Sequence, residues 1–117
     1  MSATIYHNPK CSKSRQTLEL LEKQGITPDI IEYLKSPPTA EQLQRILTQL
    51  EFVPRDLMRK KDDVYAECEI DNPSLTDVEL VNFMIKHPIL IERPIILSNG
   101  KAVIGRPPEQ VLEILST

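Results

Sequence analysis

Apolar and polar residues alternate along this chain of 117 residues in a pattern that predicts short strands and amphipathic helices. The apolar segment ATIYH, residues 3–7, predicts a short buried strand. From Ser12 the pattern takes a helical period, which predicts a helix to Gln24 with Gly25 just beyond its C-terminal end. The β-branched segment DIIEYL, residues 29–34, predicts a second strand.

Two capping boxes, Thr39 with Gln42 and Thr76 with Glu79, predict the starts of two further helices. After the first box, apolar residues recur at the spacing of one helix face: Leu43, Ile46, Leu47 and Leu50. The second helix is expected to end near Lys86, because His87-Pro88 follows it. A third, short helix over 54–61 is predicted to begin at Pro54.

The last third of the chain contains two β-rich runs within PIILSNGKAVIG, residues 94–105. Asn99-Gly100 joins them, and this dipeptide is a strong signal for a tight antiparallel hairpin. Pro107 and Pro108 then predict the start of a terminal helix. The residues expected to face inward from that helix are Val111, Leu112 and Leu115.

The predicted order is β-α-β, an all-helical insertion over residues about 38–90, and then β-β-α. A β-α-β unit places its two strands in parallel with a right-handed crossover, and the hairpin adds an antiparallel pair to the same sheet. This α/β arrangement is that of the thioredoxin/glutaredoxin-like fold. The length predicts a single domain covering residues 1–117.

Composition excludes several classes of function. The net charge is −3 with acidic and basic residues interspersed, so no broad basic face for nucleic acid is expected. No apolar run approaches the roughly 18 residues that span a bilayer, and no signal peptide is predicted. We therefore expect a cytoplasmic protein that is a monomer, with reduced thiols. The two cysteines and two histidines lack CxxC or HxxxH spacing, so no metal site is predicted.

The segment HNPKCSKSR, residues 7–15, contains the candidate nucleophile, Cys11. A thiol at a helix N-terminus with cationic neighbours is favoured as a thiolate. Here the neighbours are Lys10, Lys13, Arg15 and His7, and the Ser14 hydroxyl could donate a hydrogen bond to the sulfur. The alternative, a buried cysteine acting as a small apolar residue, fits a polar and basic loop less well.

Ser14 stands where a dithiol motif of the CxxC type has its second cysteine. The chain therefore needs an outside thiol to resolve a mixed disulfide formed at Cys11. The C-x3-R spacing also differs from the C-x5-R phosphate loop of cysteine phosphatases, which argues against phosphatase chemistry. Cys68, in the helical insertion, is interpreted as a packing residue.

The segment IYHNPKCSKSRQTLELLEKQG resembles the start of the ArsC-type, glutaredoxin-coupled arsenate reductase family, and most closely its short branch. The resemblance continues through LMRKKDDVYAE, LVNFMIKHPILIERPI and IGRPPEQVLEIL, which together cover nearly the whole chain. It implies a catalytic role for Cys11 and three anion-binding arginines, which are Arg59, Arg93 and Arg106. It also implies a cis-proline beside the cysteine, at Pro94.

This resemblance implies that the Cys11 thiolate reduces arsenate to arsenite through a thiolate–arsenate adduct. Glutathione as co-substrate and a glutaredoxin would then regenerate the thiol, with no bound cofactor. Guanidinium groups suit this task because they bind tetrahedral oxyanions in bidentate fashion and offset the repulsion between arsenate and thiolate. Residue pattern alone would make Arg59 an exposed cation of an RKK run. His7 is either a group that favours the thiolate or a polar residue ending a strand.

Two alternative functions stay open at this point. The same apparatus could serve a glutathione-dependent thiol or disulfide reductase acting on another small substrate. A Spx-type redox-sensing regulator that binds RNA polymerase has a similar fold and a matching RPI segment, residues 93–95. Its redox switch is usually CxxC, which Ser14 interrupts, and three arginines have no evident purpose there.

Overall fold

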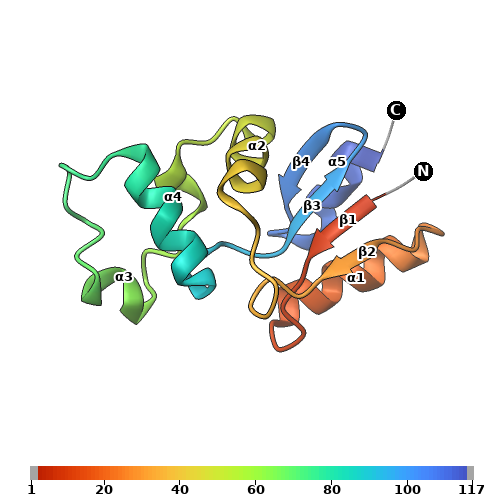
Figure 1. Cartoon of the computed structure of the whole chain (residues 1–117). Helices are drawn as coiled ribbons and strands as arrows, with labels where there is room; N and C mark the ends of the chain where they lie inside the picture. The colour runs from red at the N-terminus through yellow and green to blue at the C-terminus, as the bar shows by residue number, and fades with distance from the viewer. Residues whose placement is uncertain (1–2, 116–117) are drawn as a thin grey trace. The chain divides into compact units, whose positions relative to one another are not determined.

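The computed structural model describes residues 3–115 and divides into two compact units (Figure 1). The first, called the sheet unit below, is Met1–Ser36 together with Arg93–Thr117. The second, Pro37–Glu92, is called the helical unit. The predicted insertion matches the helical unit closely, while the prediction of one domain stays a prediction. Each unit is described by itself.

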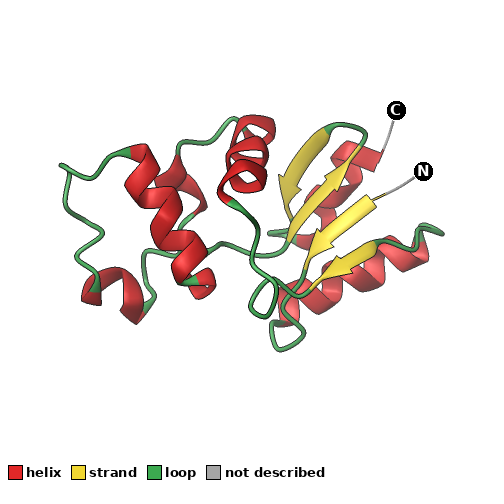
Figure 2. Cartoon of the chain, viewed as in Figure 1, coloured by secondary structure: helices red, strands yellow, loops and turns green. Residues whose placement is uncertain are grey.

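The sheet unit has the elements β1 (Ala3–Tyr6), α1 (Ser12–Lys23), β2 (Asp29–Ile31), β3 (Ile95–Ser98), β4 (Lys101–Ile104), η3 (Pro108–Val111) and α5 (Leu112–Leu115). Its four strands lie in the order β2-β1-β3-β4 (Figure 2). β1 is parallel to β2 and antiparallel to β3, and β3 is antiparallel to β4. This confirms the predicted thioredoxin-like α/β fold.

One face of this sheet is covered by helices and forms the core. Ile5 of β1 lies opposite Ile96 of β3, and both are fully buried. They pack with Leu21 of α1, and with Val111 and Ile114 near the C-terminus. Burial of a side chain of this size contributes roughly 1.5–3 kcal/mol, so this shared core fixes α1 against β3 and β4. The positions of the loops at the ends of these strands follow from that packing.

The predicted hairpin is confirmed by the backbone at its turn. Asn99 and Gly100 have φ values of 55° and 72°. Two consecutive residues with positive φ are what a tight hairpin turn requires, and Asn-Gly tolerates them best. The Asn99 amide also donates to the carbonyl of Ile114 at 3.0 Å, which ties the turn to α5.

The helical unit contains α2 (Ala40–Leu50), η1 (Pro54–Leu57), α3 (Asp63–Glu67), α4 (Asp77–Lys86) and η2 (Pro88–Leu90). Both predicted capping boxes are present, at Thr39 and at Thr76. Leu43, Ile46 and Leu47 of α2 are buried, as the helical spacing predicted. An isolated antiparallel bridge joins Met58 to Ile91.

Three predicted elements differ from the structure. The second strand ends at Ile31 and not at residue 34, because the Glu32 carbonyl accepts turn bonds from Lys35 and Ser36. The helix predicted over 54–61 is only the 3-10 turn η1, since Met58 leaves it to pair with Ile91.

The terminal helix also differs, because it begins as a 3-10 turn. The period of about three residues places Val111 and Ile114 on one buried face. Leu112, expected to face inward, is 36% exposed, whereas Leu115 is partly buried against the core. The short helix α3 was not predicted.

Candidate active site

Cys11 occupies the N-cap position of α1, where the extended backbone turns into the helix. Its own N–H donates to the carbonyl of Asn8 at 3.0 Å, which closes the loop in front of the helix. The backbone N–H groups of Ser14 and Lys13, in the first turn, lower the pKa of the Cys11 thiol, although the Cys11 side chain makes no capping hydrogen bond. Free N–H groups of a first helical turn have no partner within the helix, so an anionic sulfur satisfies them.

The electrostatic surroundings of Cys11 favour the thiolate. Burial alone raises the pKa of the thiol, but the hydrogen bond from Ser14 N–H, the charge of Arg93, the bond from Lys13 N–H and the charge of Arg106 outweigh it. The pKa of Cys11 therefore lies below its ordinary value. Both cysteines are free thiols, and Cys68 is half-buried at the end of α3.

Arg106 is the cation in direct contact with the nucleophile. Its Nη2 donates to the Cys11 sulfur at 3.5 Å, and its Nε donates to the carbonyl of Arg93 at 2.7 Å. The Gly105 N–H donates to the carbonyl of Pro94 at 3.0 Å, which continues the link between the same two segments. Residues 93–94 and 105–106, from the two ends of the hairpin, are thus fastened together beside Cys11.

The peptide bond between Arg93 and Pro94 is cis, as the family resemblance leads one to expect. A second cis bond, between Arg106 and Pro107, was not expected. Each of these two bonds follows an arginine that the sequence analysis proposed as an anion ligand.

His7 and Ser14 form a buried pair behind the sulfur. His7 Nδ1 and Ser14 Oγ lie 2.6 Å apart, and the Asn8 N–H donates to the same oxygen at 3.1 Å. The Ser14 hydroxyl thus bonds the preceding loop, and the main chain of Ser14 lowers the pKa of Cys11; a bond from the hydroxyl to the sulfur stays a prediction. Burial lowers the pKa of His7, against the opposing charge of Glu32, so the neutral imidazole is favoured and a hydrogen-bonding role fits better than a cationic one.

Arg15 also differs from the expectation. Its Nη1 donates to the carbonyl of Pro9 at 2.9 Å, on the exposed side of the loop. Its charge lowers the pKa of His7, and it is not among the groups that lower the pKa of Cys11. Arg15 therefore braces the loop, whereas the cations that act on the sulfur come from 82 or more residues further along the chain.

Arg59 lies in the helical unit, just after the Met58–Ile91 bridge and not on a helix. Its N–H donates to the carbonyl of Leu90 at 2.7 Å, and its Nη1 donates to the carbonyl of Ile89 at 3.3 Å. Asp62 lies 3.7 Å from the same nitrogen. The segment that carries Arg59 is thus well defined within its unit, while its convergence with Arg93 and Arg106 stays a prediction.

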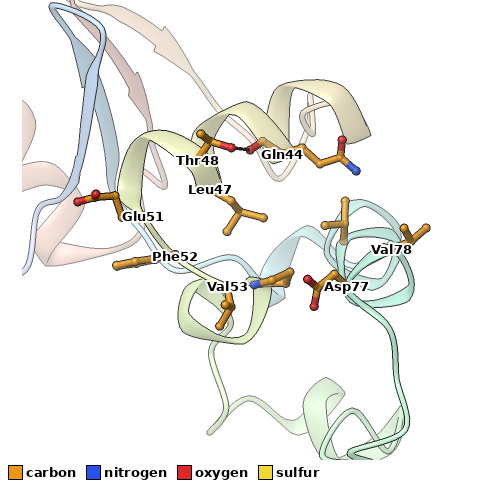
Figure 3. A pocket seen from close by; sticks show the side chains of 10 residues that line it. Gln44, Leu47, Thr48, Glu51, Phe52, Val53, Asp77 and Val78 are labelled. Carbon is orange, nitrogen blue, oxygen red and sulfur yellow. Dashed lines mark hydrogen bonds between the residues drawn. The ribbon is translucent and has the colours of Figure 1, made fainter.

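The helical unit has a hollow of its own between the end of α2 and the start of α4 (Figure 3). It measures about 350 Å³ and its lining includes Leu47, Phe52 and Val78, with the carboxylates of Glu51 and Asp77. Neither a thiol nor a basic side chain lines it, so it does not suit an oxyanion. Among residues 3–115, no set of three or more histidine, cysteine or acidic side chains is placed to hold a metal ion.

A family model named ArsC family matches residues 6–114, which include Cys11 and all three arginines. The chain belongs to the ArsC family. It is 50% identical over 116 residues to an arsenate reductase of Haemophilus influenzae, covering 98% of this chain and all of that one. It is also 50% identical over 112 residues to the uncharacterized protein YfgD of Escherichia coli, covering 95% and 94% of the two chains.

A solved structure confirms the likeness in three dimensions. An arsenate reductase from Vibrio cholerae superposes with a TM-score of 0.96 at 54% identity, covering 97% of this chain and 98% of that one.

In the part of this ArsC chain that the structure describes, no helix has both the length and the apolar surface needed to cross a membrane.

The sequence placed Cys11 at a helix N-terminus with unpaired N–H groups, but it did not show which of these groups lower the pKa of the thiol. The N–H groups of Ser14 and Lys13 leave no trace in residue identity, because any residue except proline carries one. The indirect signal was positional: a cysteine directly before a predicted helix start places its side chain over the first turn.

Proposed function

We propose that this chain is an oxidoreductase of the ArsC family that reduces arsenate to arsenite with Cys11 as its nucleophile. The observation that carries the proposal is the Cys11 sulfur, whose pKa is lowered, with the Arg106 guanidinium 3.5 Å away. The arrangement fits a reaction in which an anionic sulfur approaches an anionic substrate, because the guanidinium offsets the charge of both. The named arsenate reductases among the relatives support the choice of substrate.

In the first step the Cys11 thiolate attacks the arsenic(V) of arsenate. A sulfur–arsenic bond forms, an arsenic–oxygen bond breaks, and the departing oxygen leaves as water after taking up protons. Arg93 and Arg106 hold the arsenate oxygens as negative charge builds on them, and Arg59 is the proposed third ligand.

In the second step the thiol of glutathione attacks the Cys11 sulfur. The new sulfur–sulfur bond replaces the sulfur–arsenic bond, whose electron pair passes to arsenic and reduces it from arsenic(V) to arsenic(III). Arsenite leaves with the proton of the glutathione thiol. Ser14 leaves no second thiol at the CxxC position, so we propose that a glutaredoxin removes glutathione from Cys11 by thiol–disulfide exchange.

The test is arsenate-dependent oxidation of NADPH in a coupled system of glutathione, glutathione reductase and glutaredoxin. We expect the wild type and Cys68→Ala to turn over, and Cys11→Ser to show no turnover because a serine hydroxyl does not ionise near neutral pH. Turnover in Cys11→Ser, or loss of turnover in Cys68→Ala alone, would refute the one-cysteine mechanism.

The same assay separates the alternative functions. A glutathione-dependent reductase for another substrate would oxidise NADPH with a small mixed disulfide of glutathione and would be inert toward arsenate. A Spx-type regulator would show neither activity and would form a stable complex with RNA polymerase. Either result would overturn the proposal.

A further inference from the structure

Gly105 occupies a contact in the sheet unit that leaves no room for a side chain. A methyl group built at its Cβ position would lie 2.6 Å from Oγ1 and 3.0 Å from Cγ2 of Thr17, and 2.9 Å from Cγ of Pro94. Carbon atoms in good contact lie about 3.5–4.0 Å apart. The backbone at Gly105 is outside the left-handed region, unlike Gly25 and Gly100, so the need for glycine here is steric.

The side chain that fills this space belongs to the helix that carries the nucleophile. Thr17 is fully buried on α1, and its hydroxyl lies 2.8 Å from the carbonyl of Lys13 and 3.4 Å from that of Gly105. The main chain of Lys13 in turn lowers the pKa of the Cys11 thiol. Thr17 therefore links the first turn of α1 directly to the corner after β4.

The two residues that Thr17 faces in this contact, Gly105 and Pro94, are each next to an arginine in the chain. Gly105 precedes Arg106, which donates to the Cys11 sulfur at 3.5 Å, and Pro94 follows Arg93, whose carbonyl accepts from Arg106 Nε. The Gly105 N–H bonds the Pro94 carbonyl, so the two arginine segments meet α1 at this one place.

We propose that Gly105 and Thr17 are positioning residues, whose close contact sets the distance of Arg106 and Arg93 from the Cys11 sulfur. The groups that act on the sulfur itself are Arg106, Arg93 and the main chain of Ser14 and Lys13. Any side chain at 105 would have to push the corner away from α1, because Thr17 is enclosed in the core and the proline ring of Pro94 is rigid. A displacement of about 1 Å restores ordinary contact distances, and it is applied next to the guanidinium that faces the sulfur.

The decisive variant is Gly105→Ala, and its matched control is Gly25→Ala. Gly25 has φ 76° and open space around it, so alanine there strains the backbone beyond α1 without a steric clash. Both variants should lower the melting temperature. Only Gly105→Ala should move the pH dependence of Cys11 alkylation by iodoacetamide to higher pH, because only it separates cations from the sulfur.

A second substitution tests whether the contact with Thr17 is the cause. Thr17→Ala removes both Thr17 atoms that lie within 3.0 Å of the added methyl group. The pair Thr17→Ala with Gly105→Ala should therefore return the alkylation profile toward that of the wild type, which is a non-additive result that independent sites do not give. Thr17→Ile enlarges the same contact from the helix side and replaces Gly105→Ala as the test variant if that protein does not fold. We expect Thr17→Ile to move the alkylation profile to higher pH as well.

The arsenate arm of the test rests on the proposed function. With arsenate as substrate, kcat/KM should fall about ten- to a hundredfold in Gly105→Ala, the loss expected from a misplacement of this size. The alkylation arm needs no arsenate, so an inert wild type would refute the proposed function and leave the positioning test intact. An unmoved alkylation profile in folded Gly105→Ala, or in folded Thr17→Ile, would overturn the positioning role, as would equal movements in Gly105→Ala and Gly25→Ala.

Discussion

Replacing Arg106 by alanine tests the electrostatic account of the site most directly. The substitution removes the bond from Nη2 to the Cys11 sulfur at 3.5 Å and the bond from Nε to the Arg93 carbonyl at 2.7 Å. The first of these contacts stabilises the thiolate, and the second fastens the two arginine segments to each other. We therefore expect the pKa of Cys11 to rise and the affinity for arsenate to fall.

The size of the effect follows from the distance and from the exposure of the guanidinium. Two unit charges about 4 Å apart interact by about 1 kcal/mol in water and about 4 kcal/mol near a protein surface of effective dielectric 20. Arg106 is exposed, so solvent screening favours the lower part of this range, about 1–2 kcal/mol. A charge-assisted contact to the substrate adds about 1.5–3 kcal/mol, which corresponds to roughly a ten- to hundredfold loss in kcat/KM.

Two assays measure these quantities separately. Iodoacetamide alkylation across pH follows the Cys11 thiolate, and the coupled NADPH assay gives kcat/KM for arsenate. The full pH profile is needed because a thiolate of higher pKa is also a better nucleophile, which offsets part of the lost rate at any single pH. Arg106→Lys keeps the charge and loses the planar fork, so it should restore the alkylation profile more fully than kcat/KM.

Arg45→Ala is the matched control for the loss of one positive charge. Arg45 is an exposed residue of α2 whose partner is Glu41 of the same helix. It should leave both measurements unchanged. An alkylation profile for Arg106→Ala that overlays the wild type would refute the claim that Arg106 stabilises the thiolate. Equal effects of the two substitutions would show that only the net charge of the protein matters, and not the position of Arg106.

Four further predictions concern the thiol, the loop behind it and the helical unit. Because the pKa of Cys11 is lower in the folded state, ionised sulfur stabilises the fold above the unfolded-state pKa, and this contribution is lost as pH falls through the folded-state pKa. Melting curves of wild type and Cys11→Ser should therefore diverge in favour of the wild type as pH rises; parallel curves would contradict this. Ser14→Ala keeps the main-chain N–H that lowers the pKa of Cys11 and removes the hydroxyl that bonds the buried His7 and the Asn8 N–H, so it should cost about 1–3 kcal/mol of stability while moving the alkylation profile less than Arg106→Ala does. Arg59→Ala should lower kcat/KM for arsenate about ten- to a hundredfold and leave the alkylation profile unchanged, since the charges that lower the pKa of Cys11 are those of Arg93 and Arg106. Thr39→Ala removes a capping box and should lower the stability of the helical unit by about 1 kcal/mol, measured by chemical unfolding.

Elements that depend on a few adjacent residues were predicted correctly from the sequence. The Asn99-Gly100 turn and the Thr39 and Thr76 caps depend on a few adjacent residues, and all three occur as predicted. The end of the second strand was wrong for a different reason. Tyr33 has the burial of a core residue, at 1% exposed, but it lies in a turn and not in a strand. In this segment the apolar pattern included the buried Tyr33, but it did not show where the backbone finds its hydrogen bonds.

The charges that act on Cys11 could not be predicted from residues nearby in the sequence. Lys10, Lys13 and Arg15 are the basic residues of its own loop, and their side chains are exposed. The charges that lower the pKa of the sulfur are instead those of Arg93 and Arg106, which the pairing of β1 with β3 and of β3 with β4 brings near it. Those two arginines were found through the family resemblance, because no periodicity or spacing in the sequence connects them to residue 11.

The division into two units suggests why activation of the thiol and capture of the oxyanion can be separated. The sheet unit by itself supplies the nucleophile, the main-chain donors to it, and Arg93 and Arg106. It therefore contains everything that lowers the pKa of Cys11. Arg59, the proposed third ligand of the oxyanion, belongs to the helical unit. Substitution of Arg93 or Arg106 by alanine should therefore change alkylation and turnover together, whereas Arg59→Ala should change turnover alone.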